Sequence, residues 1–217
     1  VLRNAPDYYM PMLQTAETVA KRYGVSRDAM DQYGAASQTK AIAANEAGRL
    51  KDEVISMTVT KKVMDKETKQ ISDVQVTVDR DEGLRPSTYE QVASLKTVVD
   101  GGTITAGNAS GINDGAAALL LASEAGANRH GLKPGARILG MAVAGVPPRT
   151  MGIGPVPATR KLLKRLGMSL DDFDVLELNE AFAAQALACS RQLGLSDDDA
   201  RINTRGGAIA LGHPLGM

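Results

Sequence analysis

Hydrophobic and polar positions in the first third of the chain repeat with the spacing of helices. Residues 15–24 predict a helix that starts with Thr15 as its N-cap and stops at Gly24. Ser26 is the expected cap of a second helix, with one face formed by Met30, Tyr33, Ser37, Ala41, Ala44 and Gly48. Because these side chains are small and in places polar, we expect close packing that buries little apolar surface.

Strict alternation follows these two helices. Apolar side chains take every second position in residues 54–62 and again in residues 73–80. This pattern is typical of half-exposed antiparallel strands and not of a buried parallel sheet. The charged residues 61–70 between them predict a solvated loop.

After Gly101 the pattern changes to alternating strands and helices. Residues 102–127 predict a short strand, a loop of small residues and an alanine-rich helix capped near Asn113 or Asp114. The segments that follow predict a buried strand, a helix, a second buried strand and a helix ending at Gly194, over residues 136–148, 158–167, 174–179 and 180–194. This order indicates α/β layering, and the change of character lies around residues 100–115.

Composition and charge narrow the class of protein. Lys+Arg and Asp+Glu number 25 each and aromatic residues are 3% of the 217, which argues against a nucleic-acid surface. No apolar run reaches the roughly 18–20 residues of a membrane span, and no signal peptide precedes the first helix. One cysteine excludes an intrachain disulfide and gives little evidence for a metal site. We therefore expect a soluble, cytoplasmic α/β protein; a start without Met suggests that an N-terminal part is missing.

Asn179 stands where a predicted strand runs into a predicted helix. Ligands of open α/β sheets gather at the carboxyl ends of strands, so the amide could fix a water or polarise a carbonyl oxygen. Asparagine is also among the best N-cap residues, and the residues alone leave both roles open.

Three further side chains are candidates for chemistry. Cys189 shares a helical face with apolar residues and is interpreted as inert core, not as a nucleophile. His213 lies in the closing run RGGAIALGHPLGM, whose glycines match neither a P-loop nor a dinucleotide fingerprint. Those glycines allow close backbone approach or positive φ, and Pro214 favours an extended His213; a structural role for this histidine remains open. His130 lies in a polar turn.

The motifs NEAFAAQ and GGAIALGHPLG together resemble the paired signature of the thiolase family, the acyl-CoA C-acyltransferases. Residues 105–123 and 15–41 are similar to preceding segments of the same family, in the same order. The resemblance covers nearly the whole chain. It implies the layered αβαβα thiolase fold, here a truncated segment that includes the inserted α+β loop domain.

The resemblance also implies chemistry. Thiolases cleave a 3-ketoacyl-CoA with CoA, or condense two acyl-CoA molecules, through an acylated cysteine. His213 would be the base for that thiol and would help to hold the thioester oxygen, and Asn179 would fix a water that completes the oxyanion site. CoA and acyl-CoA are then substrates, with no permanently bound cofactor and no metal. A homodimer or homotetramer is expected, with no nucleic-acid or membrane partner.

The resemblance also implies which residues contact CoA and the substrate, because they occupy the positions that match the family's contacts. The matching residues are Met12, Arg85, Ala106, Ser110, Ile112, Met151, Ala181 and Phe182. The chain departs from the family pattern at residues 11–13, which read Pro-Met-Leu in place of His-Met-Gly, and at residues 97–99. These departures concern the acyl-chain and adenine sides, and short-chain or aliphatic 3-ketoacyl-CoA is the expected substrate.

The family's nucleophilic cysteine would precede Val1 and its second cysteine would follow Met217, so we expect roughly the middle half of a thiolase. The expected parts are a CoA-binding loop domain (residues 1–113), the last segment of the N-terminal half (114–134) and an incomplete C-terminal half (135–217). Such a fragment alone is expected to be inactive. The alternative is a non-catalytic thiolase-like module that binds CoA or a partner subunit.

Overall fold

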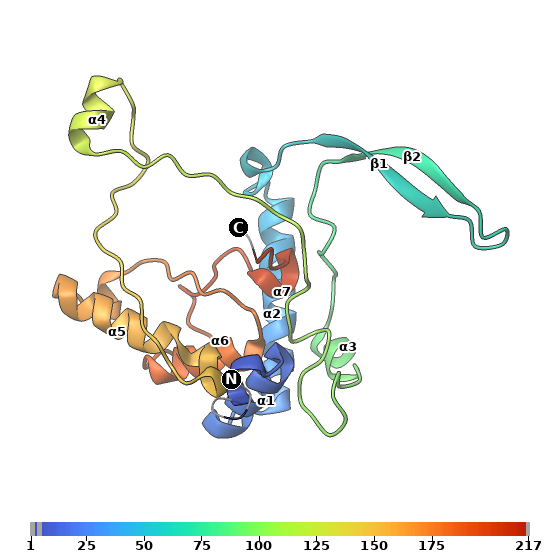
Figure 1. The fold of residues 1–217 in the computed structure, drawn as a ribbon, viewed down its shortest axis with the longest axis horizontal. Helices are drawn as coiled ribbons and strands as arrows, with labels where there is room; N and C mark the ends of the chain where they lie inside the picture. Colours follow the sequence, from blue (N-terminus) through green and yellow to red (C-terminus); the bar gives the residue numbers. More distant parts are fainter. Residues whose placement is uncertain (1–2, 4–5, 216–217) are drawn as a thin grey trace.

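The computed structural model describes residue 3 and residues 6–215, which form helices, one hairpin and long extended segments (Figure 1). The α-helices are α1 (Met12–Tyr23), α2 (Arg27–Glu46), α3 (Tyr89–Ala93), α4 (Glu124–Arg129), α5 (Pro155–Leu166), α6 (Ala183–Gln192) and α7 (Ala208–Leu211). The 3-10 helices are η1 (Pro6–Tyr9), η2 (Lys51–Glu53), η3 (Pro148–Ile153) and η4 (Leu170–Asp172). The strands are β1 (Met57–Met64) and β2 (Ile71–Val78).

Local capping chemistry sets the ends of α1 and α2. The Ser26 hydroxyl accepts a hydrogen bond from the Ala29 amide at 3.2 Å, which confirms the predicted cap of α2. Gly24 ends α1 with φ of 63°, as predicted. The predicted start of α1 is wrong, because the helix begins at Met12 directly after Pro11, whose fixed φ suits a helix entry. Thr15 instead lies inside the helix, with its hydroxyl donating to the Met12 carbonyl at 2.7 Å.

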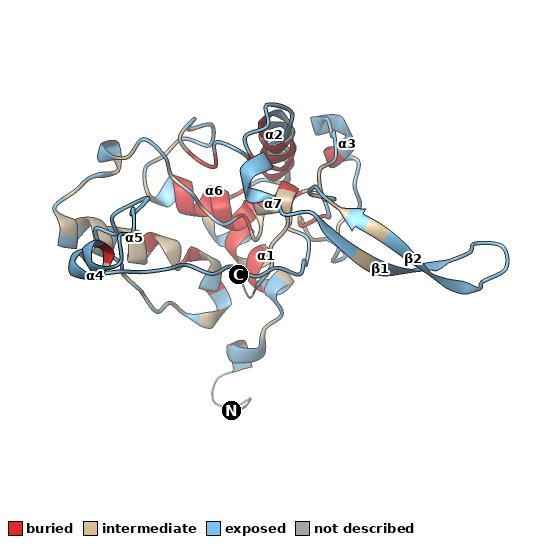
Figure 2. Ribbon diagram, turned by 90° about the horizontal axis from the view of Figure 1, so that it is seen from above, coloured by how far each residue is buried: buried red, intermediate tan, exposed pale blue. Residues whose placement is uncertain are grey.

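Helix α6 forms the centre of the core. Residues 183–190 of this helix are all buried, and α1, α2 and η3 pack around it. Figure 2 shows the buried residues concentrated in α6, α2 and α1. Small side chains of α2, among them Ser37 and Ala41, are buried in this packing, which confirms the expected close contact. The core therefore positions the two segments that flank α6, residues 174–182 and 203–215.

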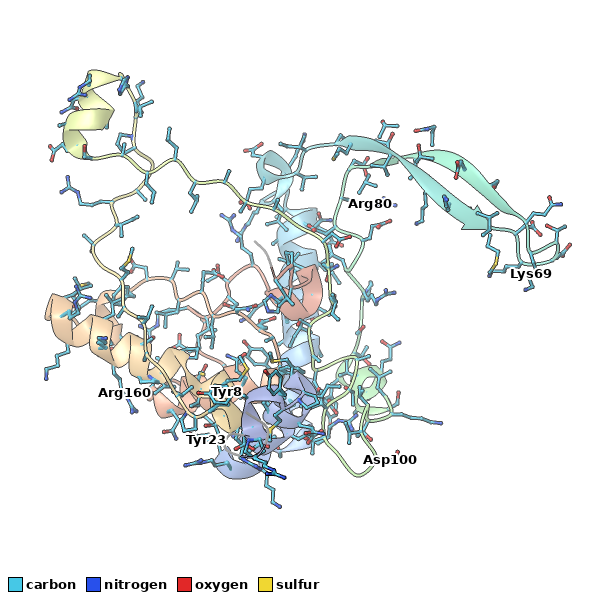
Figure 3. All side chains as sticks on the ribbon, viewed as in Figure 1. Tyr8, Tyr23, Lys69, Arg80, Asp100 and Arg160 are labelled. Atoms are coloured by element: carbon cyan, nitrogen blue, oxygen red, sulfur yellow. The ribbon has the colours of Figure 1, made fainter. Side chains whose placement is uncertain are left out.

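The antiparallel hairpin is confirmed, with Met57 opposite Val78 and Met64 opposite Ile71. It projects from the helices as an arm, with Lys69 at its far end and Arg80 near its base (Figure 3). The predicted loop is too long, since residues 61–64 belong to β1. The turn is closed where Asp65 Oδ1 accepts from the Thr68 amide at 2.7 Å. Most residues of both strands are exposed and only Val59, Val76 and Val78 are half-buried, because nothing among the described residues covers either face.

Three predictions of burial or type are wrong. The alanine-rich segment is not a helix: residues 113–122 are extended and exposed, and only α4 follows, capped by Ser123. Leu119, Leu120 and Leu121 are 87%, 81% and 68% exposed.

The two segments predicted as buried strands are extended but largely unpaired. Residues 136–146 run along α5, where Arg165 donates to the Met141 carbonyl at 2.8 Å. In residues 174–179 only Leu176 forms a bridge, with Ile202. Apolar sequence predicted burial between neighbouring strands, and the described part of the chain supplies no such neighbours. No helix in that part is long and apolar enough to cross a membrane.

Candidate active site

Asn179 and His213 meet although 34 positions separate them. Asn179 Nδ2 lies 3.2 Å from His213 Nε2. An amide nitrogen can only donate, so Nε2 accepts this hydrogen bond and the neutral ring then carries its proton on Nδ1. The pair joins a fixed donor to a basic ring nitrogen.

The capping role that the residues left open for Asn179 is wrong. Helix α6 begins at Ala183, and its N-cap position is Phe182, not Asn179. Residues 180–182 continue as irregular chain because their backbone groups pair with another segment instead of starting a helix. The Asn179 amide is therefore free to contact His213.

His213 is held by backbone on the C-terminal side of α7. Its amide donates to the Gly111 carbonyl at 3.2 Å, and it forms a parallel bridge with Ile112. Gly212 before it has φ of 103°, and a Cβ there would lie 2.4 Å from Asn113 Oδ1. Because Asn113 is an exposed side chain that could move aside, it is the positive φ that requires glycine here, and this backbone turn leads into a half-buried histidine.

The segment of residues 108–112 also pairs with the chain just after Asn179. The Ser110 amide and hydroxyl both donate hydrogen bonds to the Ala181 carbonyl at 3.1 Å, and Ala109 forms an antiparallel β-bridge with Phe182. The structure thus brings four of the expected CoA-binding residues next to the Asn179–His213 pair: Ser110, Ile112, Ala181 and Phe182.

The other four expected contacts lie on separate elements. Met12 begins α1 and Met151 lies in η3, two elements that pack together, and both side chains are exposed. Ala106 is exposed in the turn before Asn108, and the Arg85 amide donates to Gln38 Oε1 of α2 at 2.9 Å. Within residues 6–215 no hydrogen bond links these four to the pair.

Cys189 is confirmed as a core residue. Its side chain is fully buried on α6 and its thiol donates to the Gly152 carbonyl at 3.3 Å. Burial raises the pKa of this thiol to about 11. It is neither accessible nor acidic enough to act as a nucleophile near neutral pH.

A groove of about 650 Å³ lies elsewhere, between the end of α1 and residues 99–103. None of the expected site residues lines it, so it is not the site of the proposed chemistry. The part of the chain that the structure describes also contains no cluster of three metal-ligating side chains.

Sequence reasoning missed Glu180. This carboxylate directly follows Asn179 and is 1% exposed, with hydrogen bonds to three separate segments. The available signal was a charged residue within an otherwise small and apolar run.

Comparison with known proteins agrees with this geometry. The model of the thiolase N-terminal domain matches residues 5–125, and that of the thiolase C-terminal domain matches residues 132–217. The chain belongs to the thiolase family.

Similar relatives support this assignment. A beta-ketoadipyl-CoA thiolase of Pseudomonas aeruginosa is 54% identical over 209 residues, which are 95% of this chain and 50% of the relative. An acetyl-CoA acetyltransferase of Shinella zoogloeoides is 48% identical over 211 residues, 96% of this chain and 51% of the relative. The chain thus spans about half the length of the curated relatives it matches.

Solved structures confirm the fold class. The crystal structure of the Bacillus anthracis acetyl-CoA acetyltransferase matches with a TM-score of 0.84 and 42% identity, over 94% of this chain and 50% of that one. Human mitochondrial 3-ketoacyl-CoA thiolase matches with a TM-score of 0.83 and 45% identity, over 95% of this chain and 49% of that one. The described residues therefore adopt part of a thiolase fold.

Proposed function

We propose that the protein containing this chain is an acyl-CoA C-acyltransferase, which cleaves a 3-ketoacyl-CoA with CoA or runs the reverse condensation. The observation that carries the proposal is the 3.2 Å contact between Asn179 Nδ2 and His213 Nε2. A pure binding module has no evident need for a free amide aimed at a basic ring nitrogen.

In this proposal His213 generates the nucleophile. Its Nε2 releases the Asn179 hydrogen bond and takes the proton of a cysteine thiol, and the thiolate attacks the 3-keto carbon of the substrate. The C2–C3 bond then breaks, which leaves an acyl-cysteine and the enolate of an acyl-CoA. Cys189 is buried with a raised pKa, so the nucleophile is a cysteine outside these 217 residues.

The enolate and the thioester oxygen need aligned donors. His213, once protonated, donates from Nε2, and Asn179 orients a water that supplies a second donor. Because the Gly111–His213 and Ser110–Ala181 hydrogen bonds fix the backbone on both sides, little reorganisation is needed at the moment of reaction.

CoA and acyl-CoA bind as substrates and not as a resident cofactor. Ser110, Ile112, Ala181 and Phe182 would line the pantetheine end next to the pair, with Ala106, Met12 and Met151 further out and Arg85 at the nucleotide end. Residues 1–113 would then form the CoA-binding loop domain, with 114–134 and 135–217 as parts of the two thiolase halves. Homo-oligomerisation and a cytoplasmic location belong to the same proposal.

The acyl group is the finer part of the proposal. Short-chain or aliphatic 3-ketoacyl-CoA remains the expected substrate, while several similar relatives are named for beta-ketoadipyl-CoA. Comparing kcat/KM of the full-length protein for acetoacetyl-CoA, a long-chain 3-ketoacyl-CoA and beta-ketoadipyl-CoA separates these possibilities. A strong preference for either of the last two would overturn the short-chain expectation.

The experiment that tests the reaction class is capture of the acyl-enzyme. Full-length protein incubated with acetyl-CoA should gain one acetyl group on a cysteine other than Cys189, as located by mass spectrometry of its peptides. His213→Ala should slow this acylation strongly. Tight CoA binding without any acylation or turnover would instead support the alternative, a non-catalytic thiolase-like module.

A further inference from the structure

Glu180 is a buried carboxylate without a cationic partner. Its side chain is among the most deeply buried in the core, and none of the ion pairs within residues 6–215 includes it. An ionised carboxyl group is costly to bury unless hydrogen bonds replace its hydration. The hydrogen-bond donors around Glu180 therefore determine whether its side chain can remain buried.

Three donors from three different segments meet this carboxylate. Oε2 accepts from the Ser37 hydroxyl of α2 at 2.6 Å and from the Ile209 amide of α7 at 3.1 Å. Oε1 accepts from Asn203 Nδ2 at 2.8 Å. The backbone of Gly207 packs directly on the group, since a Cβ at this position would lie 2.4 Å from Glu180 Cδ.

These contacts connect the two segments that carry the active-site pair. Glu180 adjoins Asn179 in the chain, and α7, which Glu180 holds through Ile209, leads directly into Gly212 and His213. Asn203 adds a second connection, because its Oδ1 accepts from the Leu178 amide at 2.8 Å. Movement of the carboxylate would shift both partners of the 3.2 Å contact.

We propose that Glu180 is a positioning residue that sets the distance between Asn179 and His213 by anchoring α7 and the 178–180 segment to α2. This inference rests on the proposed thiolase chemistry. Glu180 itself touches neither substrate nor the reacting atoms in this scheme.

The hydrogen-bond pattern requires an acceptor oxygen at both side-chain positions of residue 180. Ile209 N–H and Asn203 NH₂ can only donate, so both oxygens of residue 180 must accept. In Glu180→Gln, either orientation of the amide turns an N–H toward one of these donors. Asn203 cannot simply flip, because its own oxygen accepts from Leu178. Glutamine has nearly the same size as glutamate, yet its amide would break the hydrogen bond of residue 180 with either Asn203 or Ile209.

The test compares Glu180→Gln with Glu177→Gln in the full-length protein. Glu177 is a matched control, because it is exposed on the same extended segment. The measurements are kcat and KM for acetoacetyl-CoA thiolysis and the pH dependence of active-site cysteine alkylation by iodoacetamide. We expect Glu180→Gln to lower kcat by up to about 10²-fold with little change in KM, the scale of a catalytic group displaced by about 1 Å.

The alkylation curve separates positioning from simple stabilisation. Glu180→Gln should move the apparent pKa of the nucleophilic thiol upward, in the same direction as His213→Ala, whereas Glu177→Gln should leave it in place. A lower melting temperature with an unchanged curve and unchanged kcat would overturn the inference. If His213→Ala itself leaves the curve unchanged, the proposed function fails, and the two failures are thus distinguishable.

A milder variant covers the case in which Glu180→Gln does not fold. Ser37→Ala removes one of the three donors from α2 and leaves the carboxylate with Asn203 and Ile209. It should shift the alkylation curve in the same direction by a smaller amount. A wild-type curve for Ser37→Ala alongside a folded protein would contradict the anchoring role.

Discussion

At the scale of single residues, burial and hydrogen-bond partners decide which side chains are available for chemistry. Asn179 contributes no cap to α6, because that helix starts at Ala183, and its amide is left to contact His213. Cys189 is not available for chemistry, because its buried position on α6 removes the thiol from solvent and raises its pKa. Two chemically capable residues on neighbouring segments thus take different roles.

The raised pKa of Cys189 predicts a pH dependence of stability. The thiol pKa rises from 9.0 to about 11 on folding, so its contribution is fully present below pH 9 and is lost as the pH rises through 11. The full effect is at most about 3 kcal/mol. Urea unfolding of wild type and Cys189→Ala should show the stability difference narrowing above pH 9. Parallel pH profiles for the two proteins would contradict this account of the buried thiol.

At the scale of elements, close backbone approach fixes α2 in place. A Cβ on Gly34 would lie 2.1 Å from the Gly107 carbonyl oxygen, so the helix rests directly on the loop of residues 105–108. That loop continues into the segment that pairs with Ala181, Phe182 and His213. Packing of α2 therefore affects the backbone of the candidate site, through the segment of residues 105–112.

Gly34→Ala is accordingly predicted to destabilise the protein, although alanine favours helix by about 1 kcal/mol. The clash with backbone outweighs this gain, and we expect a net loss of about 1–3 kcal/mol, as for overpacked cores. Gly135→Ala is the matched control, because a Cβ there meets nothing within 4 Å. Thermal melts of both variants provide the measurement; equal or higher stability of Gly34→Ala would show that the contact is loose.

The same scale shows what sequence could and could not predict. The Ser26 cap and the positive-φ glycines that follow α1 and α6, Gly24 and Gly194, were predictable, because capping chemistry acts within a few residues. The exposure of residues 136–148 and the extended conformation of the alanine-rich segment could not be predicted. Both depend on the segments that lie beside them and not on their own sequence. Alanine propensity for helix was overridden in residues 113–122, which run extended.

The candidate site was predictable only in part. Asn179 and His213 followed from recognisable motifs, and the structure adds the contact between them. Glu180 was not found, since its donors Ser37 and Ile209 lie 143 and 29 positions away in the chain. A buried carboxyl group is stable only with hydrogen-bond donors around it, and the local sequence pattern does not show donors that lie so far away in the chain.

At the scale of the whole molecule, the described residues leave much apolar surface exposed. Leu119, Leu120 and Leu121 and the segment around Met141 are exposed, and the chain spans about half the length of its curated relatives. Unpaired apolar segments of this kind favour association with other chain segments. We infer that the rest of the protein covers them.

The isolated 217-residue chain should therefore show no thiolysis of acetoacetyl-CoA, because its single cysteine is inaccessible. Purified chain should match the buffer blank in an assay that detects loss of the 3-ketoacyl-CoA. The full-length protein serves as the positive control. Turnover that persists in the Cys189→Ala chain, free of full-length enzyme, would show that the chemistry does not need a cysteine from elsewhere.

In the proposed mechanism, His213 generates the thiolate while Asn179 acts on the oxygen of the substrate. His213→Ala should harm turnover more, since loss of a general base costs about 10²–10⁴-fold and loss of one oxyanion donor about 10²–10³-fold. The two losses should not add, because both residues serve one site.

The rate of active-site cysteine alkylation by iodoacetamide, followed across pH in the full-length protein, tests this division most directly. His213→Ala should move the apparent pKa of the thiol upward, and Asn179→Ala should leave the alkylation curve almost unchanged while slowing turnover. A wild-type curve for His213→Ala would contradict the assignment of His213 as the base.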